Sequence, residues 1–231
     1  NILACRQTNM LHCDMTQRGD PSRDETLEHP DSHRQTQAER RETAERAILQ
    51  AAEKIVAERG LEELSMSEVG EAASYSRALP GHYFGSKSAL IHALTDHILA
   101  GYAERMRSGS TPHQGLDLLC DVVGFCIDDA VHNPVAVRAY QIILIGGLTR
   151  PELKPMVDGM TRQSIEDIAG LIMLARELGD VRADVNPLAE ASIIISSIRG
   201  VLFQWLINPD HVSLSHVRAC LITNVRNSLG A

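Results

Sequence analysis

The stretch that decides the fold runs from Gly60 to Leu90 and reads GLEELSMSEVGEAASYSRALPGHYFGSKSAL. It contains, in order, a glycine that can end a helix, a short helical segment, a polar turn, a second short helical segment and a Ser-Lys start to a longer helix. Two short helices joined by a tight turn, with a supporting helix on each side, are typical of a helix-turn-helix. Because that arrangement places one short helix in a DNA groove, this stretch predicts a DNA-binding head.

Serine residues mark the starts of the predicted helices in this stretch. Ser65 has Glu68 three positions later, which is the spacing of a capping box, where each side chain bonds the backbone N–H of the other residue. We therefore expect a second helix from Met66 to about Ala73, a third helix capped by Ser76, and a fourth helix capped by Ser86.

The rest of the chain shows helical periodicity and no convincing alternation of a strand. Pro151 and Pro155 are expected to break the chain between two helices. Besides the two short ones, helices are predicted at about Ala38–Arg59, Ser86–Met106, Leu116–Val131, Pro134–Leu148, Met160–Leu178, Pro187–Ile207 and Ser213–Leu229. The sequence thus predicts an all-α protein, preceded by a polar segment, residues 1–37, that we expect to be a disordered tail.

Composition excludes several classes of protein. The chain has 231 residues, of which 44% are hydrophobic but only 3% aromatic, so packed aliphatic side chains must fill its core. A net charge of −8 argues against non-specific coating of nucleic acid, which needs a broad basic surface, but allows a sequence-specific binder with a small footprint. The five cysteines are odd in number and lack CxxC spacing, so we expect no zinc site or disulfide framework.

The stretch Gly60–Leu90 resembles the TetR family of bacterial transcription regulators. The residues that carry the resemblance are Gly60-Leu61, Ser65-Met66, Val69, Ser76, Tyr83-Phe84, Ser86-Lys87 and Leu90, at the family's spacing. The resemblance covers residues 41–90 well and the C-terminal half only by general pattern. It implies a helix-turn-helix DNA-binding domain at residues 38–90 and a helical regulatory and dimerisation domain at residues 91–231.

What the resemblance implies about function is a ligand-released repressor that binds a two-fold operator as a homodimer. Its partners would be double-stranded DNA, a small-molecule effector and a second copy of the chain, with no cofactor, no metal, no membrane and no enzymatic activity. Such a protein is expected in the bacterial cytoplasm, associated with the nucleoid. Two other classes stay open from the residues alone, namely a helical protein-binding adaptor and an all-helical enzyme, although no HExxH motif supports an enzyme.

Four positions depart from the family's pattern. Ser74 and Tyr75 stand where the family usually has glycine and an aliphatic residue, and Pro80 and Gly81 stand where it has an aliphatic and an aromatic residue. A proline at the fourth position of a helix would remove one backbone hydrogen bond. We therefore expect the third helix to be shortened or bent.

The predicted DNA contacts lie on the short helices and at the start of the fourth helix. Arg77 is the best candidate for reading a base, because a guanidinium pairs in bidentate fashion with guanine, and a phosphate contact is the alternative. Lys87 is expected to bind phosphate by resemblance, together with the N–H groups of its helix. The full set of predicted DNA-binding residues is Ser65, Ser67, Ser76, Arg77, His82, Tyr83 and Lys87.

Two further sites are predicted in the C-terminal half. The segment Pro187–Ile207 is apolar around more than one face, so we expect it to be buried on both sides. With the last helix it resembles the dimer bundle of the TetR family, and the core of a monomer is the alternative. The interface residues predicted there are Ile194, Ile198, Val201, Trp205, Leu221 and Val225. A Met-rich apolar effector pocket is predicted from Phe125, Tyr140, Leu144, Met156, Met160 and Met173, with ordinary core packing as the alternative.

Overall fold

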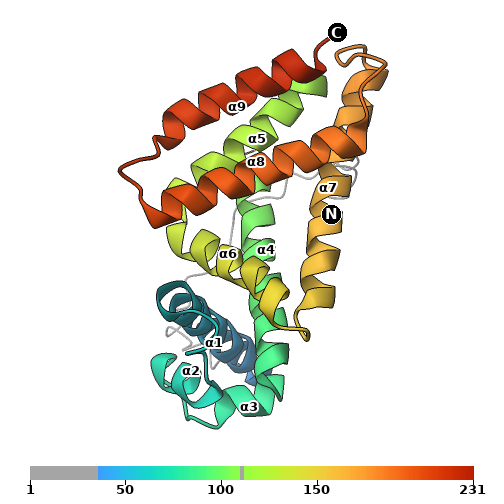
Figure 1. Ribbon diagram of the computed structural model, residues 1–231. Helices are drawn as coiled ribbons and strands as arrows, with labels where there is room; N and C mark the ends of the chain where they lie inside the picture. The colour runs from blue at the N-terminus through green and yellow to red at the C-terminus, as the bar shows by residue number, and fades with distance from the viewer. Residues whose placement is uncertain (1–35, 110–111) are drawn as a thin grey trace, which may run out of the picture.

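The computed structural model describes residues 36–109 and 112–231, and these residues form nine α-helices and no named strand (Figure 1). The all-α prediction is confirmed. The predicted tail, residues 1–37, lies almost entirely outside the described residues. The helices are α1 (Gln37–Arg59), α2 (Met66–Ala72), α3 (Leu79–Phe84), α4 (Lys87–Ser108), α5 (Gly115–His132), α6 (Pro134–Thr149), α7 (Lys154–Glu177), α8 (Pro187–Ile207) and α9 (Leu214–Leu229).

Side-chain caps define several helix starts, and those of Ser65 and Ser86 are where the sequence predicts them. Ser86 accepts a hydrogen bond from the N–H of Ala89 at 3.1 Å at the start of α4, and the Asn186 side chain accepts one from Ala189 at 3.2 Å at the start of α8. The Ser65 hydroxyl accepts from the N–H of Glu68 at 3.3 Å. The Glu68 carboxylate pairs with Arg59 instead of returning to Ser65, so only half of the predicted capping box forms.

Two predictions about helix starts are wrong. The third helix begins at Leu79, and Ser76 makes no side-chain cap, because the residues before Leu79 form a separate turn. Pro80 is consequently in the first turn of α3, where its missing N–H costs no helical hydrogen bond. For the same reason Pro155 does not break the chain, since it lies in the first turn of α7, which begins six residues before the predicted start.

The helices enclose two hydrophobic clusters that share α4. The first joins α1, α2 and the first half of α4, including Leu90 and Ile98, to Ile143 of α6 and to Leu153 before α7. The second lies among α5, α7, α8 and α9, and Met106 near the end of α4 packs against it. Figure 1 shows the first cluster's helices at one end of the molecule and α8 and α9 at the other, with α4 running between them. The predicted domain boundary at residue 90 lies inside this shared helix and stays a prediction.

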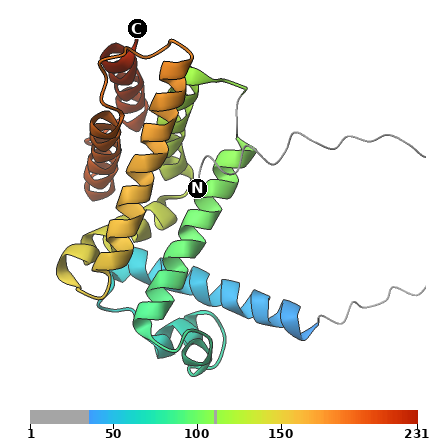
Figure 2. The same cartoon turned by 90° about the vertical axis from the view of Figure 1, so that its right-hand side faces the viewer.

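The last two helices form an outer layer, on the side away from α4 (Figure 2). Among the described residues, α8 alone is long and apolar enough to span a membrane, yet core helices of soluble proteins pass the same test. Only 22% of the residues in its most apolar stretch are buried within the described structure. Large side chains, including Ile193, Phe203 and Ile207, are exposed on it. This helix therefore carries an apolar face that the described part of the chain does not cover.

Candidate DNA interface and effector site

The turn between α2 and α3 is fixed by close backbone packing. A Cβ added to Gly70 would lie 2.6 Å from the carbonyl oxygen of Ser76, so only glycine lets the turn fold back on α2. Ser74 adopts a φ of 63°, in the left-handed region that favours glycine. A glycine would adopt this φ without strain. The turn nevertheless forms here, and Tyr75 donates its N–H to the carbonyl of Gly70 at 2.9 Å.

Most of the predicted DNA-binding side chains are exposed on the same end of the molecule. Ser65, Ser67, Ser76, Arg77 and His82 are all exposed, as a DNA contact requires. Tyr83 is half-buried, with its ring 5.5 Å from the guanidinium of Arg41 on α1, and its predicted contact depends on the part of the ring that remains accessible. The sequence pattern did not indicate this aromatic–cation contact between α1 and α3.

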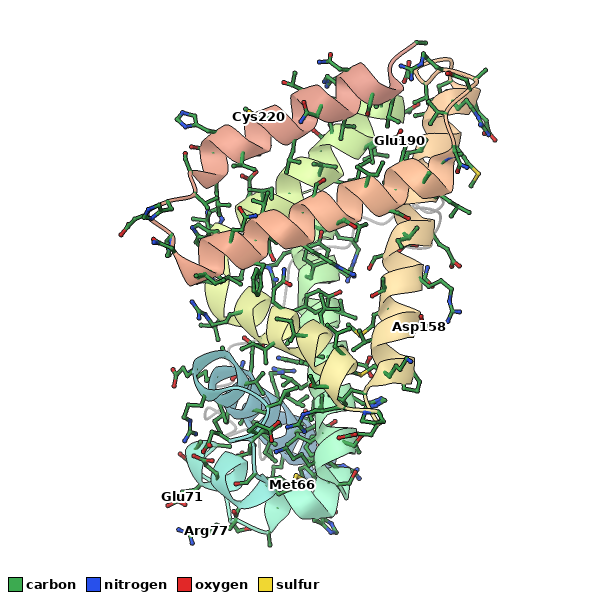
Figure 3. The ribbon with its side chains drawn as sticks, viewed as in Figure 1. Met66, Glu71, Arg77, Asp158, Glu190 and Cys220 are labelled. Atoms are coloured by element: carbon green, nitrogen blue, oxygen red, sulfur yellow. The ribbon has the colours of Figure 1, made fainter. Side chains whose placement is uncertain are left out.

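Arg77 lies at the tip of this head beside an acidic partner (Figure 3). Its Nη2 is 2.9 Å from Oε2 of Glu71, near the end of α2, and the two side chains are 72% and 64% exposed. An ion pair this exposed contributes little to stability. It does hold the guanidinium next to a carboxylate while no DNA is bound. Glu71 is thus a partner of the predicted base-reading residue that the sequence analysis missed.

Lys87 is half-buried and already has a partner inside the protein. Its Nζ donates to the backbone carbonyl of Glu62, in the loop between α1 and α2, at 3.1 Å. The side chain of Glu62 in turn pairs with Arg150, the residue that follows α6. Arg150 is 16% exposed, so this contact anchors the loop to the C-terminal half. Lys87, the predicted phosphate contact, is therefore linked through Glu62 to Arg150 at the end of α6.

A comparison with protein-family models agrees with this geometry. Residues 48–94 match the model described as bacterial regulatory proteins, tetR family, which covers the end of α1, the turn and the start of α4. This chain carries a TetR-family DNA-binding domain. It is a DNA-binding transcriptional regulator and not an enzyme.

Relatives extend the likeness of this chain beyond the head. The HTH-type transcriptional regulator UidR of Escherichia coli K12 is 26% identical over 156 residues, which are 67% of this chain and 78% of that protein. A crystal structure assigned to a TetR-family regulator of Rhodococcus sp. has a TM-score of 0.72 at 21% identity, covering 82% of this chain and 100% of that one. A regulator from Saccharomonospora viridis, crystallised with choline, has a TM-score of 0.71 at 18% identity over 82% and 99%. The two structural likenesses establish the fold.

The second half of α4 is fastened to α5 by buried polar contacts. Arg105 forms a bidentate pair with the buried Asp129, at 2.7 and 2.9 Å. One turn earlier, the Tyr102 hydroxyl lies 3.0 Å from Sγ of Cys126. Burial is the main cause that raises the pKa of the Cys126 thiol to about 11, and it also raises the pKa of Tyr102. Both groups therefore stay protonated at neutral pH.

The predicted effector residues do not all come together. The Phe125 ring packs edge-on against Tyr102, with ring centroids 5.3 Å apart, and Tyr140 is close enough to influence the pKa of that tyrosine. On α6 and α7, the side chains of Leu144, Met156 and Met160 are half-buried. Met156 and Tyr140 pack against the first hydrophobic cluster, which joins α1, α2 and the first half of α4. Met173 is 44% exposed, so the structure does not place it in an interior site.

The predicted dimer residues divide into two groups. Ile194, Ile198 and Val225 are buried in the chain's own core, so they are not accessible to a second copy. Val201, Trp205 and Leu221 are half-buried at the edge of that core. The uncovered face of α8 instead consists of Ala189, Ile193, Ser196, Gly200, Phe203 and Ile207, at helical spacing. Within the described residues no cluster of His, Cys, Asp and Glu could hold a metal ion.

Proposed function

We propose that this protein is an effector-released repressor that binds a two-fold DNA operator as a homodimer. The observation that carries the proposal is the head itself, in which an exposed Arg77 in the α2–α3 turn and Lys87 at the start of α4 flank the short helix α3 along the chain. Arg77 reads a guanine edge, and Lys87 binds a backbone phosphate. The serines at positions 65 and 67 add hydroxyl contacts to the backbone.

The homodimer assignment is supported by the uncovered face of α8. Ile193, Phe203 and Ile207 are exposed there, while the small Ser196 and Gly200 leave room for close approach of a second helix. Nothing lies within 4 Å of a Cβ added to Gly200. A two-fold pair of subunits would cover this face and place two heads on the two halves of a palindromic site.

Coupling between effector and DNA runs through α4 and α6. The Arg105–Asp129 pair fixes the far end of α4 to α5, and the Glu62 loop joins Lys87 to Arg150 after α6. A molecule that displaces α6 relative to α5 moves the start of α4 as well. Repression ends if the effector binds the displaced arrangement more tightly than the DNA-binding one. The choline complex of the Saccharomonospora regulator is consistent with a small-molecule effector in this fold.

The experiment that tests the function is a mobility-shift assay on DNA upstream of the protein's own gene. We expect a shifted complex that survives excess random DNA, and a reporter under that promoter that is repressed by the protein. Equal affinity for the upstream DNA and for random DNA would contradict the proposal of a specific operator there.

A further inference from the structure

One half-buried guanidinium in the C-terminal half has no acidic partner. Arg105 and Arg150 are also half-buried, and each pairs with a carboxylate, of Asp129 and Glu62 respectively. Arg199, half-buried in the middle of α8, has no carboxylate oxygen within 4.0 Å in the described part of the chain. Its Nη1 donates to the hydroxyl of Thr161 on α7, at 3.1 Å.

The position of Arg199 is set by three helices. The side chain of Gln141, buried on α6, donates its Nε2 to the backbone carbonyl of Arg199 at 3.3 Å, which fixes this point of α8 to α6. Thr161 follows Met160 directly, and Gln141 follows Tyr140 directly. Arg199 therefore lies where α6, α7 and α8 meet, next to two of the residues predicted to line the effector site.

A guanidinium in this setting has unused binding capacity. It carries five N–H donors and a fixed positive charge, whereas the Thr161 hydroxyl is neutral and accepts only one of these hydrogens. Partial burial makes an uncompensated charge unfavourable, and an anion is the partner that removes this cost. The same hydroxyl can donate its own hydrogen to that anion, so arginine and threonine form a two-point donor site.

We propose that Arg199 and Thr161 bind the anionic group, a carboxylate or phosphate, of the effector that controls this regulator. The half-buried Tyr140, Leu144 and Met160 on the neighbouring helices contact the apolar body of the same molecule. The biological meaning of this site rests on the proposed effector-controlled function. Its chemistry does not, because anion binding is measured on the protein without DNA. The choline bound to the Saccharomonospora regulator is a cation, so the ligand chemistry proposed here comes from the residues of this chain.

The test uses inorganic phosphate as the first probe and the full chain as the protein. Thermal unfolding is measured in phosphate and in chloride at equal pH and ionic strength, for the wild type and for Arg199→Gln. We expect phosphate to raise the unfolding temperature of the wild type more than that of Arg199→Gln. Arg162→Gln is the matched control, because Arg162 is exposed on α7 one residue from Thr161 and pairs with Asp158. Its response to phosphate should equal that of the wild type.

A second pair of probes tests the apolar part of the ligand. Octanoate and octanol have the same chain length but differ in charge, and we expect only octanoate to bind. Binding is measured by the fluorescence of the single tryptophan, Trp205. Arg199→Gln should weaken that binding at least tenfold, and Arg199→Lys should restore part of it. Equal responses of the wild type and Arg199→Gln to phosphate overturn the proposal, whatever octanoate does.

Operator binding separates this site from the proposed function. Arg199→Gln should bind the upstream DNA as tightly as the wild type when no anion is added. If Arg199→Gln loses DNA binding or unfolds at a lower temperature in chloride, Arg199 is a structural residue and the proposal is wrong. If the wild type itself fails to bind the upstream DNA while the phosphate difference persists, the operator proposal fails and the anion site stands.

Discussion

Replacing Glu71 by glutamine tests how the reading surface uses Arg77. The two side chains form an exposed ion pair at 2.9 Å, and a pair of this kind is worth about 0.5 kcal/mol. In water, two unit charges about 4 Å apart interact by about 1 kcal/mol, which sets the upper limit for the attraction that Arg77 gives up when it leaves Glu71 for DNA. Removing the negative charge should therefore strengthen DNA binding by about 0.5–1 kcal/mol for each head. That is about 2- to 5-fold per head, and about 5- to 30-fold for a dimer that uses both heads.

The assay is fluorescence anisotropy of labelled DNA at one fixed salt concentration, with operator and with random DNA. Glu71→Gln frees Arg77 to reach phosphates, so we expect random DNA to gain more affinity than operator and the ratio of the two affinities to fall. The decisive control is the same substitution in an Arg77→Ala background, where it should have little effect on affinity. If Glu71→Gln strengthened binding equally in both backgrounds, the carboxylate would act on the DNA directly, and the reasoning that assigns it to holding Arg77 would be refuted.

Four further predictions follow from named contacts. Lys87→Ala should weaken operator and random DNA by the same factor and lower the slope of log affinity against log salt by about 0.9 per head, whereas an unequal loss in anisotropy titrations would mark a base contact. Arg150→Ala should weaken operator binding, and its effect should shrink in a Lys87→Ala background, because the Glu62 loop joins the two residues; additive losses in the double-mutant cycle would disprove the link. Burial raises the pKa of the folded Cys126 thiol to about 11, whereas in the unfolded chain the thiol has its ordinary pKa of about 9.0. Urea unfolding should therefore show stability falling by up to about 1.4 kcal/mol per pH unit between these two pH values, and Cys126→Ala should flatten that fall. Phe203→Asp should give folded monomers by light scattering and circular dichroism, whereas Ile198→Asp, in the buried core, should unfold the chain; a Phe203→Asp dimer would remove the α8 interface.

The contacts of Glu62 with Lys87 and Arg150 connect the DNA-binding head to the C-terminal half. The head is not joined to the rest only by α4, because Leu61 also packs close to Gly146 of α6, where an added Cβ would lie 2.6 Å from Leu61 Cδ1. A substitution of Gly146 by a larger residue would therefore push the loop that carries Glu62. This loop connects Arg150, at the end of α6, to Lys87, a predicted DNA contact.

What the sequence by itself determined was the all-α class, the positions of most helices and the helix-turn-helix. These follow from interactions between residues near each other in the chain, such as the Ser86 cap and the helical spacing of apolar residues, and local interactions are visible in a sequence. The same local rules misplaced the start of α3 and the role of Pro155, because turn geometry decides where a helix begins and a proline is harmless in the first turn.

What only the tertiary structure decided was which side chains face each other across the fold. The pairs Glu71–Arg77, Glu62–Arg150 and Arg105–Asp129 join residues from different elements, and no spacing rule brings them together. Helix α8 carries large apolar side chains both on its core face and on its uncovered face. The sequence therefore could not distinguish Ile198, which is buried, from Ile193, which is exposed. The reason is physical: side-chain identity fixes what a residue can bind, but the packing of distant helices decides what it meets.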